Sequence, residues 1–161
     1  MAYHPRGFCY TPVMHINAKL AEITDCLYRV SAKALIISEG KILLVREKEG
    51  WWGIPGGGVD YGENIVDSVK RELSEEISVP VDKMTVKNKI LFITTNTVID
   101  GIPKANIYYE VTLKSNDIKA NDDILEIKWA ASSEFDSLNF GPSTAPIVSE
   151  LKSLLLSHGS V

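Results

Sequence analysis

Three glutamates near the middle of the chain could form a site for a divalent cation. On a helix that turns by about 100° per residue, Glu72, Glu75 and Glu76 occupy a narrow arc beside the apolar Val69 and Leu73. Like charges this close repel one another, and a hard cation with oxygen ligands is their natural compensation. Magnesium fits best, because it binds through a few carboxylates and keeps positions for water and phosphate oxygens.

A glycine-rich loop comes before these carboxylates. A run such as Gly56, Gly57 and Gly58 is by itself more often a turn than a phosphate site. Ahead of a helix, however, it lets the backbone approach phosphates closely, where amide dipoles favour negative charge. Trp51 and Trp52 come just before the loop, where an aromatic ring could stack on a nucleobase. Packing of at least one of them in the core or at its rim is the alternative.

The segment from Gly57 to Val79 resembles the Nudix box. In that pattern Gly is followed after five residues by Glu, after seven more by Arg-Glu, and then by an aliphatic residue, any residue, Glu-Glu, any residue, Gly and an aliphatic residue. The residues that match are Gly57, Glu63, Arg71, Glu72, Leu73, Glu75, Glu76 and Val79. Only the second glycine is missing, and Ser78 stands in its place.

This serine is expected to be tolerated. The glycine at this position normally ends the helix in a left-handed conformation. A residue with a Cβ there costs about 1 kcal/mol, or the helix ends differently before Pro80. Because no ligand is lost with the substitution by Ser78, we expect activity to be kept.

The resemblance implies a hydrolase that cleaves a nucleoside diphosphate linked to another moiety, by attack of water on phosphorus. By motif position, Glu75 and Glu76 would bind the metal directly. Glu72 would bind metal or position and deprotonate the water, and the Gly56 carbonyl would be a further ligand. Gly57 and Gly58 would lie against the substrate. The expected cofactor is Mg²⁺, with Mn²⁺ as an alternative.

Other residues are expected to support this site. Arg71 keeps its charge and can steady the carboxylates one turn away, and Glu63 would be an accessory carboxylate. The resemblance implies a further base or ligand on a later loop or strand. Glu126 is our first choice, since a similar Glu precedes a Trp-bearing strand in the family, and Asp122 and Asp123 are the alternatives. An exposed strand carboxylate is an equally good interpretation of Glu126.

The elements that position these residues can be predicted from periodicity. β-Branched runs predict a first hairpin closed at Glu39-Gly40, a second around Asp100-Gly101, and one later strand. The predicted strands cover residues 27–38, 41–48, 86–99, 105–115 and 124–131. Apolar residues near every fourth position after Gly62 predict a helix that Pro80 cannot continue. A capped helical turn over 132–140 and a closing helix over 142–159 follow.

This order of elements indicates an α+β layered domain. The resemblance implies an α/β/α sandwich around a mixed β-sheet. Residues 27–157 would form the Nudix hydrolase domain, and 158–161 a C-terminal tail. Residues 1–26 show no clear period and would be an N-terminal extension packed on the domain or on a partner subunit. Tyr108 and Tyr109 occupy adjacent strand positions, so at most one of them can line a given pocket.

Composition limits the classes of function. The chain has 161 residues, 45% of them hydrophobic and 24% charged, as in one globular domain. A net charge of -4 gives no basic surface for a nucleic-acid polymer, so a small nucleotide is the expected partner. No apolar run approaches the roughly 20 residues of a membrane span. We expect a cytoplasmic protein without a membrane partner, with Cys9 and Cys26 unpaired, and a homodimer is compatible with the sequence.

The class of substrate can be narrowed only through the family signatures that the chain lacks. The chain lacks a proline near position 95, as in ADP-ribose hydrolases, a tyrosine near 96–97, as in dinucleoside polyphosphate hydrolases, and the upstream coenzyme A signature. A nucleoside triphosphate or a nucleotide sugar remains. The alternative function is a non-catalytic Nudix-fold module that binds a nucleotide metabolite. In such a module the box carboxylates would be expected to be replaced by other residues, whereas this chain has kept them. A diphosphate isomerase ranks last, since the additional catalytic motifs that it needs are missing.

Overall fold

The computed structural model describes residues 28–99, 102–115, 117–121 and 123–158 of the chain. The predicted N-terminal extension, Asp122, the turn at 100–101, both cysteines and residues 159–161 lie outside the described residues.

The strands form two sheets. The first contains β1 (Arg29–Leu35), β6 (Ile102–Leu113) and β5 (Met84–Ile99), in the order β1-β6-β5. Strand β1 runs parallel to β6, and β5 runs antiparallel to it. In the second sheet, β3 (Lys41–Glu47) pairs antiparallel with β2 (Ile37–Ser38), β4 (Trp52–Gly53) and β7 (Ile124–Ala131). The strands are therefore mixed in direction, as the resemblance implies.

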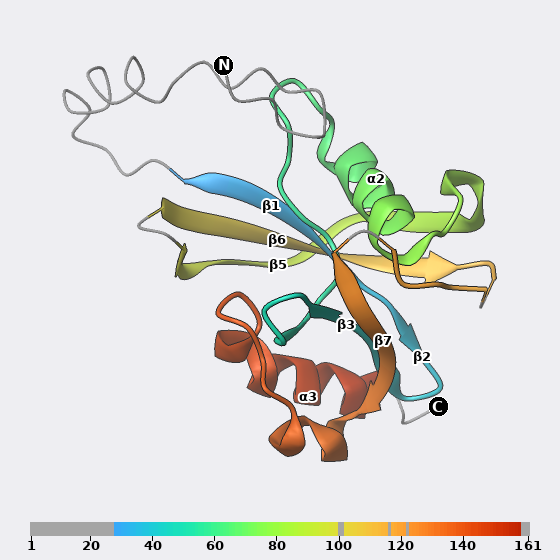
Figure 1. The fold of residues 1–161 in the computed structure, drawn as a ribbon, viewed down its shortest axis with the longest axis vertical. Coiled ribbons are helices and arrows are strands. Elements are labelled where there is room, and N and C mark those ends of the chain that lie inside the picture. Colours follow the sequence, from blue (N-terminus) through green and yellow to red (C-terminus); the bar gives the residue numbers. More distant parts are fainter. Residues whose placement is uncertain (1–27, 100–101, 116, 122, 159–161) are drawn as a thin grey trace.

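Helices cover the strands from both sides. Helix α2 (Ile65–Ile77) lies on one side, and α3 (Val148–His158) lies on the other (Figure 1). Three short 3-10 segments complete the described elements: η1 (Val81–Lys83), η2 (Ser132–Ser137) and η3 (Ala145–Ile147). The predicted α+β class and the α/β/α sandwich are confirmed. Among the described residues, neither α-helix has the length and apolar character to cross a bilayer.

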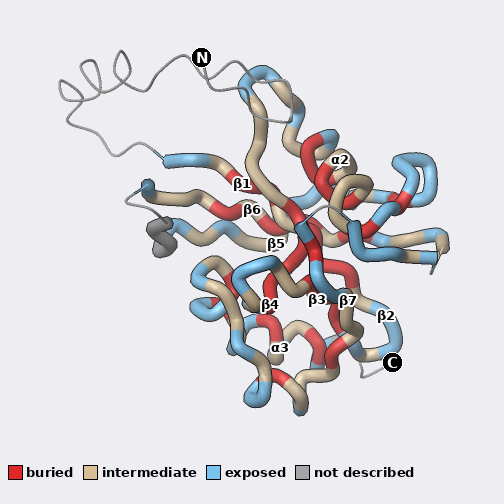
Figure 2. The backbone as a smooth tube through the Cα atoms, viewed as in Figure 1, coloured by how far each residue is buried: buried red, intermediate tan, exposed pale blue. Residues whose placement is uncertain are grey.

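The core consists of two apolar clusters, one beneath each helix. Buried residues lie where the strands cross between α2 and α3 (Figure 2). On β3, Leu43 and Val45 pack in the cluster of α2, whereas Ile42 and Leu44 pack in the cluster of α3. Strand β3 is thus buried on both faces, which explains its nearly continuous apolar sequence. The alternation also separates Tyr109, on the α2 side, from Tyr108, on the α3 side, as predicted.

The first predicted hairpin is only partly correct. Residues 27–38 do not form one strand, because β1 belongs to the sheet of β6, whereas β2 begins after Ile36 and pairs with β3. The tight turn is present at Glu39 and Gly40, both with positive φ, as a type I′ turn requires. Apolar periodicity could not reveal the break, since Leu35 and Ile36 are buried on either side of it. The second predicted hairpin is confirmed by the pairing of β5 with β6.

Candidate active site

Helix α2 begins two residues after the predicted position. Asn64 is its N-cap, and its side chain accepts a hydrogen bond from the Val66 amide at 2.9 Å. Glu63 therefore lies outside the helix, where its carboxylate accepts from the Asp60 amide at 3.1 Å and pairs with Arg71. The sequence ahead of α2 thus orients an accessory carboxylate toward the helix surface.

The end of α2 accommodates the serine that departs from the family pattern. Ser78 adopts φ 57° and ψ 28°, the left-handed conformation that a glycine takes at this position. The last helical carbonyls are satisfied by the segment that follows β6: Lys119 N–H donates to Ile77 at 3.1 Å, and Asn121 N–H donates to Glu76 at 3.0 Å. The helix therefore ends as the pattern requires, with a side chain in a conformation that favours glycine.

Arg71 is the centre of an ion-pair network on α2. Its Nε and one terminal nitrogen donate to the two carboxylate oxygens of Glu63 at 2.8 and 2.9 Å, and its other terminal nitrogen donates to Glu72 at 2.7 Å. It also reaches Glu75 at 3.4 Å and the Gly58 carbonyl at 3.0 Å. The hydrogen bonds from Arg71 lower the pKa of Glu63 to about 2, and the same contacts raise the pKa of Arg71. Arg71 thereby fixes Glu72 and ties the helix to the glycine loop.

Glu76 lies in a different environment, on the glycine-loop side of the helix. Its carboxylate accepts a hydrogen bond from the Gly56 amide at 2.8 Å, and the ammonium of Lys33 donates to the Gly56 carbonyl. Burial raises the pKa of Glu76 to about 7; Glu72 and Glu47 add to the rise, whereas Lys33 and the Gly56 amide oppose it. A carboxyl in this setting is stabilised as an anion by any additional positive charge.

The glycine loop packs tightly between β1 and α2. Ala32 N–H donates to the Gly57 carbonyl at 2.9 Å, so the loop runs alongside β1 like a short strand. A Cβ at Gly57 would lie 2.6 Å from the Glu72 carboxylate, and a Cβ at Gly56, where φ is 116°, would collide with the Ala32 carbonyl. Gly57 is therefore required for the backbone to approach Glu72, and Gly56 is required for it to approach β1.

The oxygen atoms in this corner are suited to a hard cation. Glu72 and Glu76 come from α2 and the carbonyl comes from Gly56 of the glycine loop, and together they provide the donor type that Mg²⁺ prefers. Glu75 is more exposed, with 32% of its side-chain surface accessible, and it faces Arg71. In the described part of the chain, no three His, Cys, Asp or Glu side chains are grouped as they are around a bound ion.

The structure does not bring Glu126 to this corner. Glu126 pairs with Arg46 at 2.8 Å and is half exposed, on the face of β7 opposite to Ile127 and Trp129, which pack toward α2. Asp123 pairs with Lys48. The carboxylate from outside the box that does lie near Glu76 is Glu47. Sequence reasoning missed Glu47; its position at the end of the apolar strand β3, beside the glycine loop, was the available signal.

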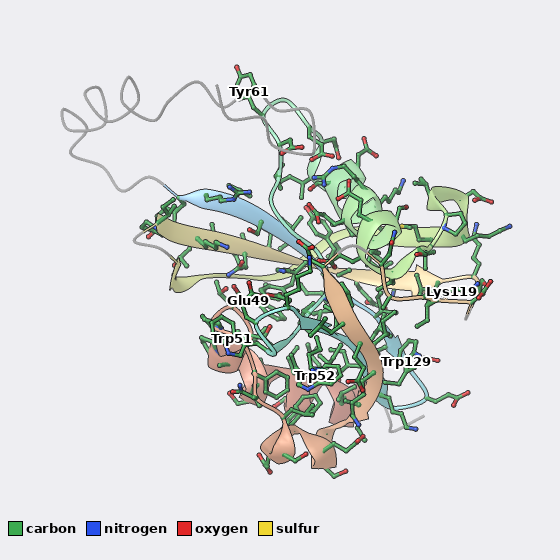
Figure 3. The ribbon with its side chains drawn as sticks, in the orientation of Figure 1. Glu49, Trp51, Trp52, Tyr61, Lys119 and Trp129 are labelled. Carbon is green, nitrogen blue, oxygen red and sulfur yellow. The ribbon has the colours of Figure 1, made fainter. Side chains whose placement is uncertain are left out.

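A cavity opens beside the glycine loop, on the face of β1 and β6 that is turned toward α3. Its wall includes Trp51, which is 37% exposed and packs against Gly141. Trp52 also touches the cavity but is buried in the apolar cluster of α3, beneath Arg46. Figure 3 shows both tryptophans on the α3 side of the molecule, with Tyr61 far away. The predicted core role therefore applies to Trp52.

Three cations belong to the remaining lining of the cavity, which also includes the apolar Ile54 and Pro142. Arg29, Lys33 and Lys104 line it together with Glu47, and Gly57 and Gly58 form its border with the carboxylates. Apart from the box glycines, these residues lie on strands and carry no motif, so the sequence alone gave no reason to group them. The arrangement places cations beside the backbone of the glycine loop, which suits phosphate groups.

Comparison with known proteins decides the family. Residues 27–151 match the profile of the NUDIX domain. The protein belongs to the Nudix family. A Nudix hydrolase of Bacillus subtilis named YvcI is 34% identical over 74 residues, which is 46% of this chain and 42% of YvcI, so the match spans less than half of that relative.

One further relative and two solved structures align over most of their length. The Escherichia coli nucleoside triphosphatase NudI is 27% identical over 134 residues, covering 75% of this Nudix chain and 94% of NudI. The solved structure of a MutT Nudix hydrolase from Burkholderia pseudomallei superposes with a TM-score of 0.63 at 25% identity, over 76% of this chain and 97% of that one. A UDP-X diphosphatase, at 16% identity and a TM-score of 0.67 over 95% of this chain and 74% of that one, shares the fold.

Proposed function

We propose that this protein is a magnesium-dependent pyrophosphohydrolase, which cleaves the diphosphate of a nucleoside diphosphate derivative by attack of water on phosphorus. The observation that carries the proposal is the corner where Glu76, the buried Glu72 and the Gly56 carbonyl lie beside a cavity whose lining includes three cations. Oxygen donors and phosphate-binding cations are needed together for diphosphate hydrolysis, and here one glycine loop separates them.

Gly56, Glu72 and Glu76 would hold the cation. A divalent cation there would neutralise charge on the diphosphate and acidify water at the site. Lys33, which donates to the Gly56 carbonyl in this structure, would release that oxygen to the cation and donate with Arg29 to phosphate oxygens at the edge of the glycine loop. Arg71 would keep Glu72 in place through its 2.7 Å hydrogen bond, so that this carboxylate could take the proton of the attacking water.

The role of a carboxylate from outside the box goes to Glu47 in preference to Glu126. Glu47 lies near Glu76 and lines the cavity, whereas Glu126 is engaged with Arg46 on the other face of its sheet. Glu75 would bind the cation from the exposed side of the site.

A nucleoside triphosphate is the favoured substrate. NudI, whose length is covered almost fully, is named a nucleoside triphosphatase. The three cations of the cavity suit a polyphosphate chain better than the neutral sugar of a nucleotide sugar. Trp51 would stack on the nucleobase.

The test is the initial rate of hydrolysis of a panel of nucleoside triphosphates and nucleotide sugars, with Mg²⁺ and with Mn²⁺. We expect at least one nucleotide to be cleaved, with activity lost in Glu76→Gln, reduced in Glu47→Gln and retained in the matched control Glu126→Gln. If no nucleotide is cleaved faster than by Glu76→Gln, the proposal is wrong. Stabilisation by a nucleotide without any turnover would instead favour the non-catalytic binding module.

A further inference from the structure

The side chain of Asn106, in the middle of β6, carries a buried polar atom that lacks a hydrogen-bond partner. Asn106 has no exposed surface, and its Nδ2 donates to Thr94 Oγ1 at 3.3 Å. Its Oδ1 is the only buried side-chain oxygen or nitrogen within the described ranges for which the structure contains no partner. Buried amide groups are nearly always paired, because an unpaired one destabilises the fold. An unpaired atom in a cavity is therefore a place to look for a ligand.

Asn106 lies on the floor of the cavity beside the glycine loop. Along β6, Lys104 and Asn106 point to the same face, and in the register of the parallel pair they adjoin Arg29 and Ser31 of β1. All four side chains line the cavity. The neutral pair Ser31 and Asn106 therefore lies about 6.6 Å, the rise of two strand residues, from the cationic pair Arg29 and Lys104, and Lys33 follows Ser31 on the same face of β1.

The surroundings divide the cavity into two parts. Arg29 covers Gly58 and Lys33 bonds the Gly56 carbonyl, so two of the cations lie against the glycine loop. Asn106 lies one strand farther from that loop, since β6 is separated from it by β1. Trp51 lines the same cavity from the segment between β3 and β4. Anionic groups fit the first part, and an uncharged hydrogen-bonding group beside an aromatic ring fits the second.

We infer that Asn106 is a specificity-determining residue, which selects the nucleoside part of the substrate by accepting a hydrogen bond at Oδ1. This inference rests on the proposed function. The donor on the ligand is an N–H group of the base or a hydroxyl of the sugar, which share the same chemistry. A site whose buried polar atom is left unpaired by the wrong ligand discriminates against that ligand.

A purely structural role for Asn106 makes a different prediction. If the amide served only to hold Thr94, removal of the amide would lower stability and leave substrate choice unchanged. Selection by Oδ1 instead requires that the ratio of activities between substrates changes, while the protein stays folded.

The test compares wild type with Asn106→Leu, which has a similar volume and no polar atom, and with Asn106→Ala in case the leucine does not fit. Thr94→Val is the matched control, since it removes the partner of Nδ2 and leaves Oδ1 in place. The measured quantities are kcat and KM for ribonucleoside triphosphates, their 2′-deoxy and 3′-deoxy forms, and a purine analogue that lacks the exocyclic amino group. The deoxy series and the base analogue distinguish a sugar donor from a base donor.

We expect wild type and Thr94→Val to prefer the nucleotide that has the donor by about tenfold in kcat/KM, the value of one hydrogen bond. In Asn106→Leu the preference should disappear, mostly through KM, with kcat for the analogue retained. Ratios in the folded Asn106 variants that stay within twofold of wild type would overturn the inference. If wild type cleaves no nucleotide, the proposed function fails instead, and the same ratios of Kd, measured with nonhydrolysable triphosphates, still decide the role of Asn106.

Discussion

Replacement of Glu76 by glutamine should stabilise the cation-free protein while it abolishes activity. In the folded protein, burial raises the pKa of Glu76 from its ordinary value of 4.5 to about 7. Ionised Glu76 therefore opposes folding in the absence of a cation. A glutamine side chain has nearly the same shape, carries no charge and can still accept the hydrogen bond from the Gly56 amide.

The magnitude follows from linkage between proton binding and folding. Each pKa unit corresponds to about 1.4 kcal/mol, so a carboxyl whose pKa rises from 4.5 to about 7 destabilises the fold by about 3 kcal/mol once it is ionised. Between these two values the folded state binds more protons than the unfolded state, so stability falls as pH rises. Below pH 4.5 the carboxyl is protonated in both states, and the difference from glutamine vanishes.

The assay is urea unfolding of wild type and Glu76→Gln with a chelator present, at a series of pH values from 4 to 8. The variant should match wild type at the acid end and exceed it by about 3 kcal/mol at pH 8. Glu75→Gln is the matched control on the same helix, and loss of its partly exposed 3.4 Å ion pair with Arg71 should change stability by less than about 1 kcal/mol. A Glu76→Gln variant that is less stable at pH 8, or a difference that does not depend on pH, would refute the reasoning.

Three further predictions concern neighbouring residues. Glu63→Gln should show a pH dependence of stability opposite to that of Glu76→Gln, because the folded pKa of Glu63 is lowered from 4.5 to about 2. The variant should be less stable than wild type by about 3 kcal/mol at pH 7. Urea unfolding should show this deficit shrinking as pH falls toward 2. Ser78→Gly should raise stability by about 1 kcal/mol and Tm by about 2 to 4 °C, with kcat unchanged, because the serine has a positive φ; a lower Tm would contradict this. Gly57→Ala should lower kcat by about 100-fold, since the new Cβ would lie 2.6 Å from the Glu72 carboxylate and displace it. Circular dichroism should show that the variant keeps its fold. A kcat equal to that of wild type would contradict the prediction.

Much of the fold could be predicted because its signals are local. Helix α2 carries its periodicity, cap and stop within a short segment, and the pairing of β5 with β6 follows from strands adjacent in sequence. The parallel pairing of β1 with β6 joins residues about 75 positions apart, as Arg29 and Lys104 show. No local pattern specifies that register. The lining of the cavity depends on it, and so Asn106 could not be singled out from the sequence.

For the candidate active site, the sequence predicted the residue types of the box and did not predict the directions of their side chains. The spacing of the box indicated which carboxylates share a helix face, but not that Arg71 holds Glu72 while Glu76 turns to the Gly56 amide. The side of the sheet on which Glu126 lies depends on strand alternation and on the bulge after Arg46, which set its pairing with that residue. A resemblance to a motif identifies residue types, whereas side-chain direction comes from the sheet.

The most direct test of the proposed chemistry is hydrolysis of a nucleoside triphosphate in ¹⁸O-labelled water with Mg²⁺ present, read by mass spectrometry of the products. We expect one labelled oxygen per turnover, on a phosphate-bearing product, and almost none with Glu76→Gln. Binding of the nucleotide without incorporation of label, or equal incorporation by wild type and Glu76→Gln, would contradict a hydrolytic site built on Glu72, Glu76 and the glycine loop.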